Sequence, residues 1–223
     1  MRLTLIQMNS RTASRNENVE RACAFVDEAA HQNPDIVVLP EFFNTEYFPQ
    51  YRDYRYMDYA EADDGFTQTR MKEKARQHGF HIVSTIFEIA RPGLNYDTAM
   101  LISPQGEIVG KYRKVHPAAY LSLEKIYFRG GSSFPVFRVG DWTVGFSTCY
   151  DNLFPESCRC LMLHGAELQQ WKPQLGRRRC MGPPSVPPPR LNVRQVSPCR
   201  PPLRPFPSPM PQISQSPVGS SSR

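Results

Sequence analysis

Strand-like and helical patterns of apolar and polar positions follow one another along the first 168 residues. Residues 1–9 alternate between the two kinds of side chain and predict a short strand. Ser14-Arg15-Asn16-Glu17 has the spacing of a capping box. Apolar side chains then recur at helical intervals, at Val19, Ala22, Cys23, Val26 and Ala30. The pattern therefore predicts a strand followed by an amphipathic helix.

The elements that follow are buried strands, a loop and a second helix. The continuous apolar run over 35–39 suits a strand in a sheet that is covered on both faces. A tyrosine-rich polar loop over 47–64 precedes a helix over 67–77, which Gly79 ends. A further strand is predicted over 81–89.

Two hairpins are predicted further along the chain. Strands over 96–102 and 107–112 flank the turn sequence Ser103-Pro104-Gln105-Gly106. Strands over 134–139 and 142–147 flank Gly140-Asp141. Because strands alternate with helices, the predicted class is α/β.

Three ionisable residues lie just past strand-like runs. Glu41 follows the first buried run, and Lys114 stands in Gly110-Lys111-Tyr112-Arg113-Lys114-Val115-His116. Cys149 stands in Thr148-Cys149-Tyr150-Asp151, after the apolar run 142–147. A cysteine between a strand and a helix is a candidate nucleophile, because a helix N-terminus lowers the pKa of a thiol and its N–H groups can hold an oxyanion. The chain thus supplies a carboxylate, an amine and a thiol, in that order.

These residues and their contexts resemble the nitrilase, or carbon-nitrogen hydrolase, superfamily, whose sites use a Glu, a Lys and a Cys. Residues 154–159, followed by Gly165-Ala166-Glu167, are similar to the segment after the family nucleophile. Residues 123–131 are similar to the segment with a second active-site Glu, which adds Glu124. The resemblance covers about residues 1–168 and implies an α-β-β-α sandwich.

The resemblance implies a role for each of these residues. Cys149 attacks the carbon of an amide or nitrile, a thioester forms as ammonia leaves, and water completes the cycle. Glu41 is the general base. Lys114 and the backbone N–H of Tyr150 stabilise the oxyanion, and Glu124 orients Lys114 or the substrate. No metal and no organic cofactor is implied.

Each residue also has an ordinary structural explanation. Cys149 alone could be a packed thiol, and Glu41 could be a solvated or helix-initiating carboxylate. Lys114 could be one of three cations, with Lys111 and Arg113, on a solvated strand. Cys158-Arg159-Cys160 lacks a second ligand pair with zinc spacing. The histidines have no carboxylate partner at a recognisable spacing, so none is assigned to catalysis: His31, His78, His81, His116 and His164.

The segments Tyr-Arg-Lys-Val-His, at residues 112–116, and Cys-Tyr-Asp-x-x-Phe-Pro-Glu, at residues 149–156, are most similar to segments of amidases that act on N-carbamoyl compounds and related amides. The expected partner is a small amide or carbamoyl substrate, with nitrile hydrolysis as the alternative within the same family. A complete chain of this family is expected to form a homo-oligomer.

Residues 169–223 differ in composition from the rest. They hold 14 of the 22 prolines, no Asp or Glu, and nine of the 27 basic residues, which leaves 18 basic against 21 acidic residues in 1–168. Proline removes a backbone donor, and a segment this poor in apolar residues cannot offset its ordering entropy. We therefore predict an incomplete hydrolase domain over 1–168, without its C-terminal half, and a disordered tail over 169–223.

The abrupt change at residue 169 suggests a reading-frame change or an aberrant gene end, and hence an inactive fragment whose sheet has an uncovered apolar face. A basic tail can also bind nucleic acid, but this one carries no recognisable binding motif, so no nucleic-acid partner is expected. The N-terminal residues show no long apolar run, so neither secretion nor membrane insertion is indicated. Free thiols in the cytoplasm are expected for the six cysteines, Cys23, Cys149, Cys158, Cys160, Cys180 and Cys199.

Overall fold

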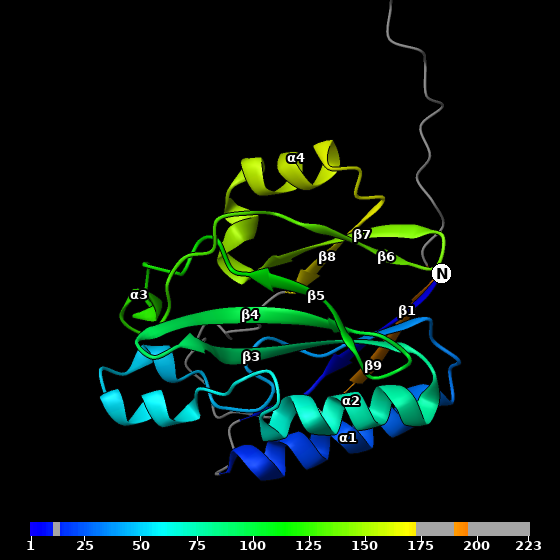
Figure 1. Cartoon of the computed structure of the whole chain (residues 1–223), viewed down its shortest axis with the longest axis horizontal. Helices are drawn as coiled ribbons and strands as arrows, with labels where there is room; N and C mark the ends of the chain where they lie inside the picture. Colours follow the sequence, from blue (N-terminus) through cyan, green and yellow to red (C-terminus); the bar gives the residue numbers. More distant parts are fainter. Residues whose placement is uncertain (11–13, 173–189, 196–223) are drawn as a thin grey trace, which may run out of the picture.

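Two β-sheets face each other between outer helices in the computed structural model, which describes residues 1–10, 14–172 and 190–195 (Figure 1). The larger sheet has the order β5 (Ile108–Arg113), β4 (Leu94–Ile102), β3 (His81–Arg91), β2 (Ile36–Val38), β1 (Arg2–Gln7) and β9 (Arg190–Gln195). The smaller sheet has the order β6 (Val136–Val139), β7 (Trp142–Thr148) and β8 (Leu168–Lys172).

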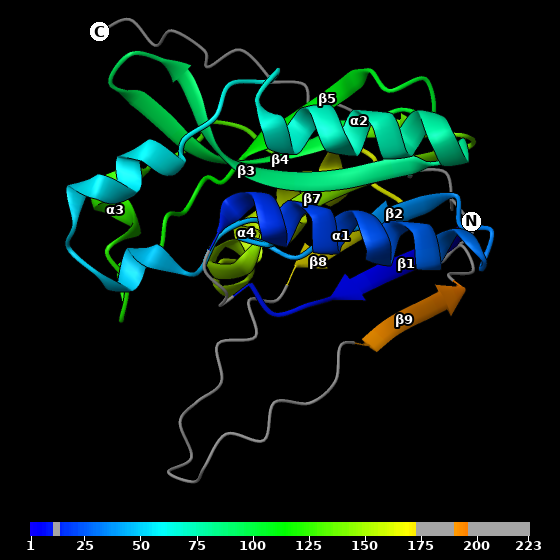
Figure 2. The ribbon, with the colours of Figure 1, turned by 90° about the horizontal axis from the view of Figure 1, so that it is seen from below.

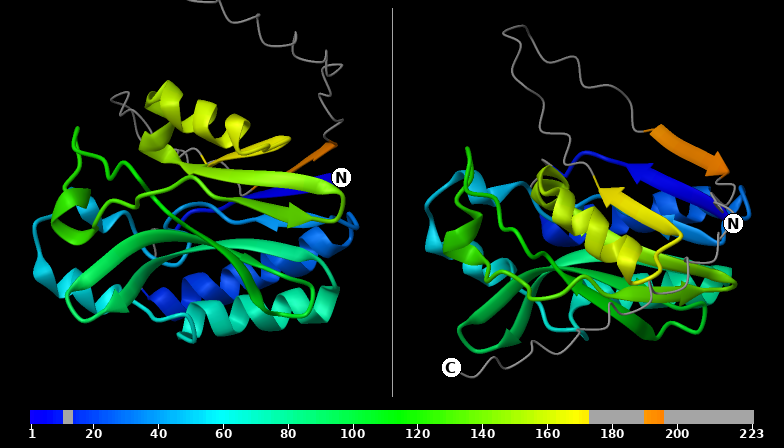
Figure 3. Two further views of the ribbon diagram at one scale, coloured as in Figure 1. Left: turned by 45° about the horizontal axis from the view of Figure 1, so that its top comes forward. Right: turned by 90° about the horizontal axis from the view of Figure 1, so that it is seen from above.

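Helices cover the outer face of each sheet. α1 (Arg15–Ala30) and α2 (Phe66–His78) lie side by side against the larger sheet, as the view from below shows (Figure 2). α4 (Pro155–Leu163) lies over the smaller sheet (Figure 3). The layers are therefore α, β, β and α, and the predicted α/β class and sandwich architecture are confirmed.

The helix ends follow the local sequence signals. The Ser14 side chain caps α1 by accepting a hydrogen bond from the Glu17 N–H at 3.2 Å. Val19, Ala22 and Val26 are fully buried against the sheet. Gly79 ends α2 with φ +71°, a left-handed conformation that glycine adopts without a steric penalty.

The order of the strands brings two candidate residues to one edge of the larger sheet. β1, β2 and β3 are parallel, while β4 is antiparallel to both β3 and β5. β5 therefore runs in the same direction as β2. Glu41 follows β2 and Lys114 follows β5, so both lie beyond the carboxyl ends of their strands.

The inner face of the larger sheet is covered by the smaller sheet. Side chains from both sheets form one buried cluster between them: Leu3, Ile36, Val38, Val83, Ala99, Leu101, Tyr112, Val139, Val144 and Phe146. The expectation of an uncovered apolar face is therefore wrong for the described residues. The β6–β7 hairpin and β8 supply the covering side chains.

Two strands fall inside the segment for which the sequence predicts disorder. β8 pairs in parallel with β7 from Leu168 opposite Val144 to Lys172 opposite Thr148. β9 pairs antiparallel with β1. The structure thus places residues 169–172 and 190–195 in paired strands, whereas the sequence predicts disorder from residue 169 onward. The rest of this segment, 173–189 and 196–223, lies outside the described residues, and the division into domain and tail stays a prediction.

Local turns show what the patterns predicted and what they missed. The hairpin of β4 and β5 turns at Gly106 with φ +76° and is confirmed. β3 and β4 also form a hairpin, which the sequence analysis did not predict; it turns at Pro92-Gly93, and both strands are longer than predicted. The tyrosine-rich loop contains two 3₁₀ helices, η1 (Phe48–Gln50) and η2 (Tyr54–Tyr59). None of the described helices is both long and apolar enough to cross a membrane.

Candidate active site

Lys114 lies at the centre of a buried ionic cluster. Its Nζ is 2.8 Å from Glu41 Oε1, 2.8 Å from Glu124 Oε2 and 3.5 Å from Asp97 Oδ2. The four side chains are between 0 and 2% exposed. We call these four residues the Lys114 cluster. The structure thus brings together three of the residues that the sequence singled out and adds Asp97.

Different elements deliver these side chains to one point. Glu41 follows β2, Lys114 follows β5, and Glu124 begins the short helix α3 (Glu124–Tyr127). Asp97 lies within β4, and its backbone C=O accepts the N–H of Lys114 at 2.9 Å. The cluster is therefore fixed by the sheet itself and by one helix end.

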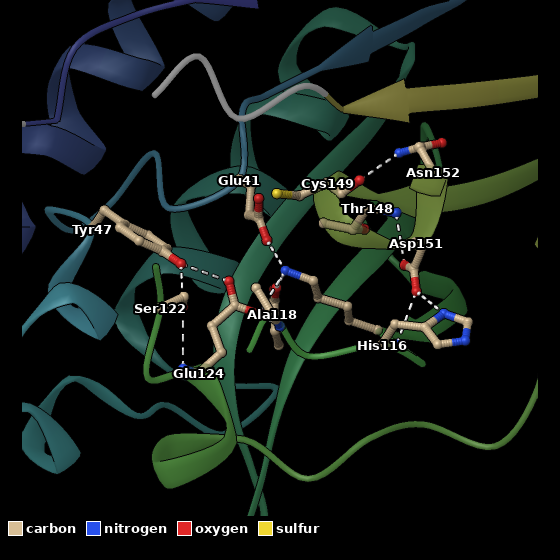
Figure 4. A network of polar contacts seen from close by, with 12 residues as sticks. Glu41, Tyr47, His116, Ala118, Ser122, Glu124, Thr148, Cys149, Asp151 and Asn152 are labelled. Carbon is tan, nitrogen blue, oxygen red and sulfur yellow. Dashed lines mark hydrogen bonds and ion pairs between the residues drawn. The ribbon is translucent and has the colours of Figure 1, made fainter. Parts of the chain in front are cut away.

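Cys149 lies beside this cluster at a strained position. It begins the 3₁₀ helix η3 (Cys149–Leu153) directly after β7, with φ +46°. A residue other than glycine rarely adopts this conformation, which costs on the order of 1–3 kcal/mol. Figure 4 shows its sulfur pointing toward the carboxyl group of Glu41. The strained turn therefore aims the thiol at the carboxylate.

Asp151 braces the turn that carries Cys149. One of its oxygens accepts the Thr148 N–H at 2.9 Å and the Tyr112 hydroxyl at 2.5 Å. The other accepts the His116 N–H at 2.9 Å and lies 2.9 Å from His116 Nδ1 (Figure 4). Because Tyr112 and His116 flank Lys114 in the sequence, one buried carboxylate links the segment of the lysine to the turn of the cysteine.

The pKa of the Cys149 thiol is raised, chiefly by burial and then by the negative charge of Glu41. Lys114 opposes this shift but does not reverse it. The pKa is therefore not lowered, as the sequence led us to expect from a helix N-terminus, because burial and the negative charges of Glu41, Glu124 and Asp97 raise it. The resting site holds a thiol, which needs a base before it can attack.

Lys114 keeps its charge in spite of its burial. Burial by itself lowers the pKa of this lysine, but Glu41, Asp97 and Glu124 raise it well above the ordinary value. Burial also raises the pKa of Glu124, against the effect of Lys114. The site therefore contains a permanent cation surrounded by carboxyl groups that resist full ionisation.

Tyr47 and Ala118 hold Glu124 in place. The Tyr47 hydroxyl donates to Glu124 Oε1 at 2.9 Å and lies 2.6 Å from Ser122 Oγ (Figure 4). The backbone N–H of Ala118 donates to Glu124 Oε2 at 2.7 Å. Glu124 therefore turns one oxygen to the lysine and the other to the loop that contains Tyr47.

The backbone N–H of Tyr150, the expected second oxyanion donor, belongs to the residue directly after Cys149 in the first turn of η3. The Tyr150 side chain contacts Phe154 edge to face at 5.6 Å between ring centroids.

His116 has a carboxylate partner that sequence spacing does not reveal. It pairs with Asp151, and its ring stacks on Phe154 with centroids 3.9 Å apart. His78 likewise pairs with Asp27, so two of the described histidines have carboxylate partners that are far from them in the sequence. Glu41, not His116, lies on the side of the Cys149 sulfur (Figure 4).

Within the part of the chain that the structure describes, no group of three or more His, Cys, Asp or Glu side chains has the arrangement of a metal site. The described cysteines Cys23, Cys149, Cys158 and Cys160 are free thiols. Cys180 and Cys199 lie outside the described residues.

Comparison with known proteins defines the class. The profile of the family described as "Carbon-nitrogen hydrolase" matches residues 2–188, which is most of the chain. The chain belongs to the carbon-nitrogen hydrolase family, and the similarity extends past residue 168, where the sequence motifs end.

Two relatives with known names are similar to this chain. The chain is 34% identical over 169 residues to a nitrilase of Pyrococcus abyssi and 32% identical over 173 residues to omega-amidase NIT2 of Homo sapiens. Both alignments cover 75% of this chain, but 63% and 61% of those proteins. The chain therefore spans less than two thirds of the length of these relatives.

Solved structures share the fold. A carbon-nitrogen hydrolase from Helicobacter pylori G27 superposes with a TM-score of 0.73 at 25% identity, over 78% of this chain and 59% of that one. A variant of the amidase from Nesterenkonia sp. AN1, in complex with butyramide, gives a TM-score of 0.69 at 25% identity, over 78% and 65%.

Proposed function

We propose that the site hydrolyses the carbon–nitrogen bond of a small amide through a thioester on Cys149. The observation that supports this most strongly is the placement of a buried lysine 2.8 Å from each of two glutamates, beside a cysteine at a strained turn. A base, a cation and a nucleophile at these positions are the parts that acyl transfer requires.

In the first half of the cycle, Glu41 takes the proton of the Cys149 thiol as the sulfur bonds to the amide carbon. The carbonyl oxygen gains negative charge, which the ammonium of Lys114 and the Tyr150 N–H stabilise. When the carbon–nitrogen bond breaks, the proton on Glu41 goes to the departing nitrogen. Ammonia leaves and a thioester remains.

In the second half of the cycle, water replaces the thiol as the nucleophile. Glu41 takes a proton from water as the water oxygen bonds to the thioester carbon, and the sulfur leaves as a thiolate that regains the proton. The product is a carboxylic acid and the thiol is restored. Because the pKa of Cys149 is raised, a nearby base is needed in the first half.

An unsubstituted amide is the favoured substrate class, with N-carbamoyl compounds as a narrower possibility within it. The human relative is an omega-amidase, and the Nesterenkonia amidase holds butyramide. The name of the Pyrococcus relative favours nitrile hydrolysis as the second candidate. A nitrile consumes a first water before the thioester forms, so the two reactions share the same residues.

The test is release of ammonia from butyramide and from butyronitrile. Cys149→Ala is expected to release none from either, whereas Cys158→Ser, which changes an exposed thiol on α4, keeps the wild-type rate. Ammonia release by Cys149→Ala at the wild-type rate would exclude the thioester mechanism.

The inactive-fragment alternative predicts a different result. The chain as given would then release no ammonia, while a chimera carrying the C-terminal half of a relative in place of residues 169–223 would do so in a Cys149-dependent manner. Turnover by the unmodified chain on the order of one per second rules that alternative out.

A further inference from the structure

The Lys114 cluster contains more carboxyl groups than its one cation can balance. Glu41, Asp97 and Glu124 surround a single ammonium, and Cys149 and the buried Tyr112 hydroxyl are the other titratable groups that face Asp97. With all three carboxyls ionised, the cluster would carry two uncompensated negative charges away from water. Burial of unpaired charge is costly enough that a group takes up a proton instead.

The contacts indicate which carboxyl holds the proton. Glu124 accepts bonds from Tyr47, Ala118 and Lys114, and donors of this kind favour the charged form. Glu41 lies 2.8 Å from the Lys114 ammonium. Asp97 is the most distant of the three, at 3.5 Å, and its Oδ2 receives no hydrogen bond from a described donor.

We propose that Asp97 is a positioning residue whose carboxyl group holds a proton at neutral pH and donates it in a hydrogen bond to the carboxylate of Glu41. Glu41 is then held between a neutral donor on β4 and the ammonium of Lys114. Its orientation is fixed toward Cys149, and the cluster loses one negative charge.

The electrostatics of Asp97 agree with this arrangement. Burial raises the pKa of Asp97 well above its ordinary value, and the charge of Glu41 and a hydrogen bond with Glu41 raise it further, against the effect of Lys114. Two carboxyls can share a hydrogen bond only if one of them holds a proton. The protonation state is independent of the proposed function, whereas its effect on turnover rests on it.

The first experiment measures stability against pH for the wild type and Asp97→Asn, which resembles the neutral acid and cannot ionise. An unfolded Asp loses its proton above about pH 4, but the folded protein is expected to keep it. Ionisation then favours the unfolded chain as pH rises. The denaturation midpoint of Asp97→Asn minus that of the wild type should therefore increase from pH 4 to pH 7.

The matched control is Glu88→Gln, on the partner strand of the same hairpin. The pKa of Glu88 is lowered, so the same difference should decrease over this pH range. A difference for Asp97→Asn that stays constant or decreases would show that Asp97 is ionised and overturn the proposal. If the variants unfold irreversibly, the infrared difference spectrum between wild type and Asp97→Asn decides, because only a protonated carboxyl contributes an acid C=O band at neutral pH.

The second experiment tests positioning and needs no turnover. Alkylation of Cys149 by iodoacetamide is followed by mass spectrometry of the peptide that contains this residue. The rate measures how effectively Glu41 removes the proton of the thiol. Asp97→Ala should slow this reaction by about 10- to 100-fold, because a small displacement of the base is costly, and Asp97→Asn should restore most of the rate. Equal rates in all three proteins would overturn the positioning role.

Turnover separates this inference from the proposed function. A kcat that falls in Asp97→Ala and recovers in Asp97→Asn, with KM little changed, supports both. If the wild type hydrolyses neither amide nor nitrile, the proposed function fails, while the stability, infrared and alkylation results still decide the state and role of Asp97.

Discussion

Two ionic clusters in the same region of the larger sheet have opposite charge balance. In the Glu88 cluster, which comprises Glu88, Thr98, Lys111 and Arg113, one carboxylate meets two cations and a hydroxyl at 2.6 to 3.1 Å. In the Lys114 cluster, one cation meets three carboxyls. Side chains of a strand alternate between its faces, so Lys111 and Arg113 point away from Tyr112, which packs between the sheets.

The two clusters respond differently to burial. Burial opposes ionisation of Glu88, but bonds from Arg113, Thr98 and Lys111 outweigh it and lower its pKa to about 2. In the Lys114 cluster burial raises the pKa of Asp97, Glu124 and Cys149, and the negative charge of neighbouring carboxyls raises it further. A carboxylate with enough cationic partners, such as Glu88, stays ionised and stabilises the fold, whereas a cluster with more carboxyls than cations keeps a proton that can move.

The largest effect is expected for Glu41→Gln, which keeps the shape of the side chain and removes the base. We expect kcat to fall by about 10²- to 10⁴-fold, since one carboxylate moves protons in both halves of the cycle. Glu88→Gln removes the carboxylate of the Glu88 cluster instead and is expected to retain wild-type kcat at a temperature where it is folded. Equal losses in the two variants would remove the functional distinction between the clusters.

The second prediction concerns Lys114→Met, which leaves three buried carboxyls without their cation. Loss of one partner of a buried ion pair costs about 3–5 kcal/mol, so the free energy of unfolding should fall by this amount at pH 7. The loss should shrink toward pH 4, where the carboxyls take up protons. Lys111→Met is the control, because its side chain is 31% exposed and Glu88 keeps Arg113. Chemical denaturation at pH 4 and pH 7 measures both.

The sequence predicted Glu41, Lys114, Glu124 and Cys149 because each stands in a local motif. Asp97 has no such motif: a single charge in the apolar strand 96–102 becomes meaningful only when β2, β5 and α3 bring their residues to it. The sign of the Cys149 pKa shift was missed for the same reason, since it depends on buried groups far away in the sequence.

The same limit applies to the fold. Helix caps, hairpin turns and buried strands are local features, and α1, α2 and the β4–β5 hairpin follow from them. The pairing of β8 with β7 is not local, and the composition of residues 169–223 concealed it. The composition of a long segment does not reveal a short strand within it. A strand of five residues forms when the edge of a sheet is available to pair with it.

The third prediction separates the clusters by the sign of their pH dependence. Glu88→Gln should lower the free energy of unfolding at pH 7 by about 3 kcal/mol, because the lowered pKa of Glu88 corresponds to stabilisation of this size. The folded pKa lies below the unfolded one, so this stabilisation is complete above about pH 4.5 and is lost as pH falls toward 2. A loss in Glu88→Gln that persisted unchanged at pH 2 would be due to packing rather than charge.

The smallest effect is expected at the margin of the Glu88 cluster. Asp63 pairs with Lys111 through a side chain that is 46% exposed, and water and salt screen such a pair. Asp63→Asn should therefore lower the free energy of unfolding by less than about 1 kcal/mol, and the loss should disappear when denaturation is repeated at about 1 M salt. The loss in Glu88→Gln should persist in the same salt, because Glu88 is 1% exposed. The opposite outcome is a loss in free energy of unfolding for Asp63→Asn that is as large and as resistant to salt as the loss for Glu88→Gln. In that case the exposed pair would stabilise the fold as much as the buried one, and burial would not explain which pairs of this cluster are strong.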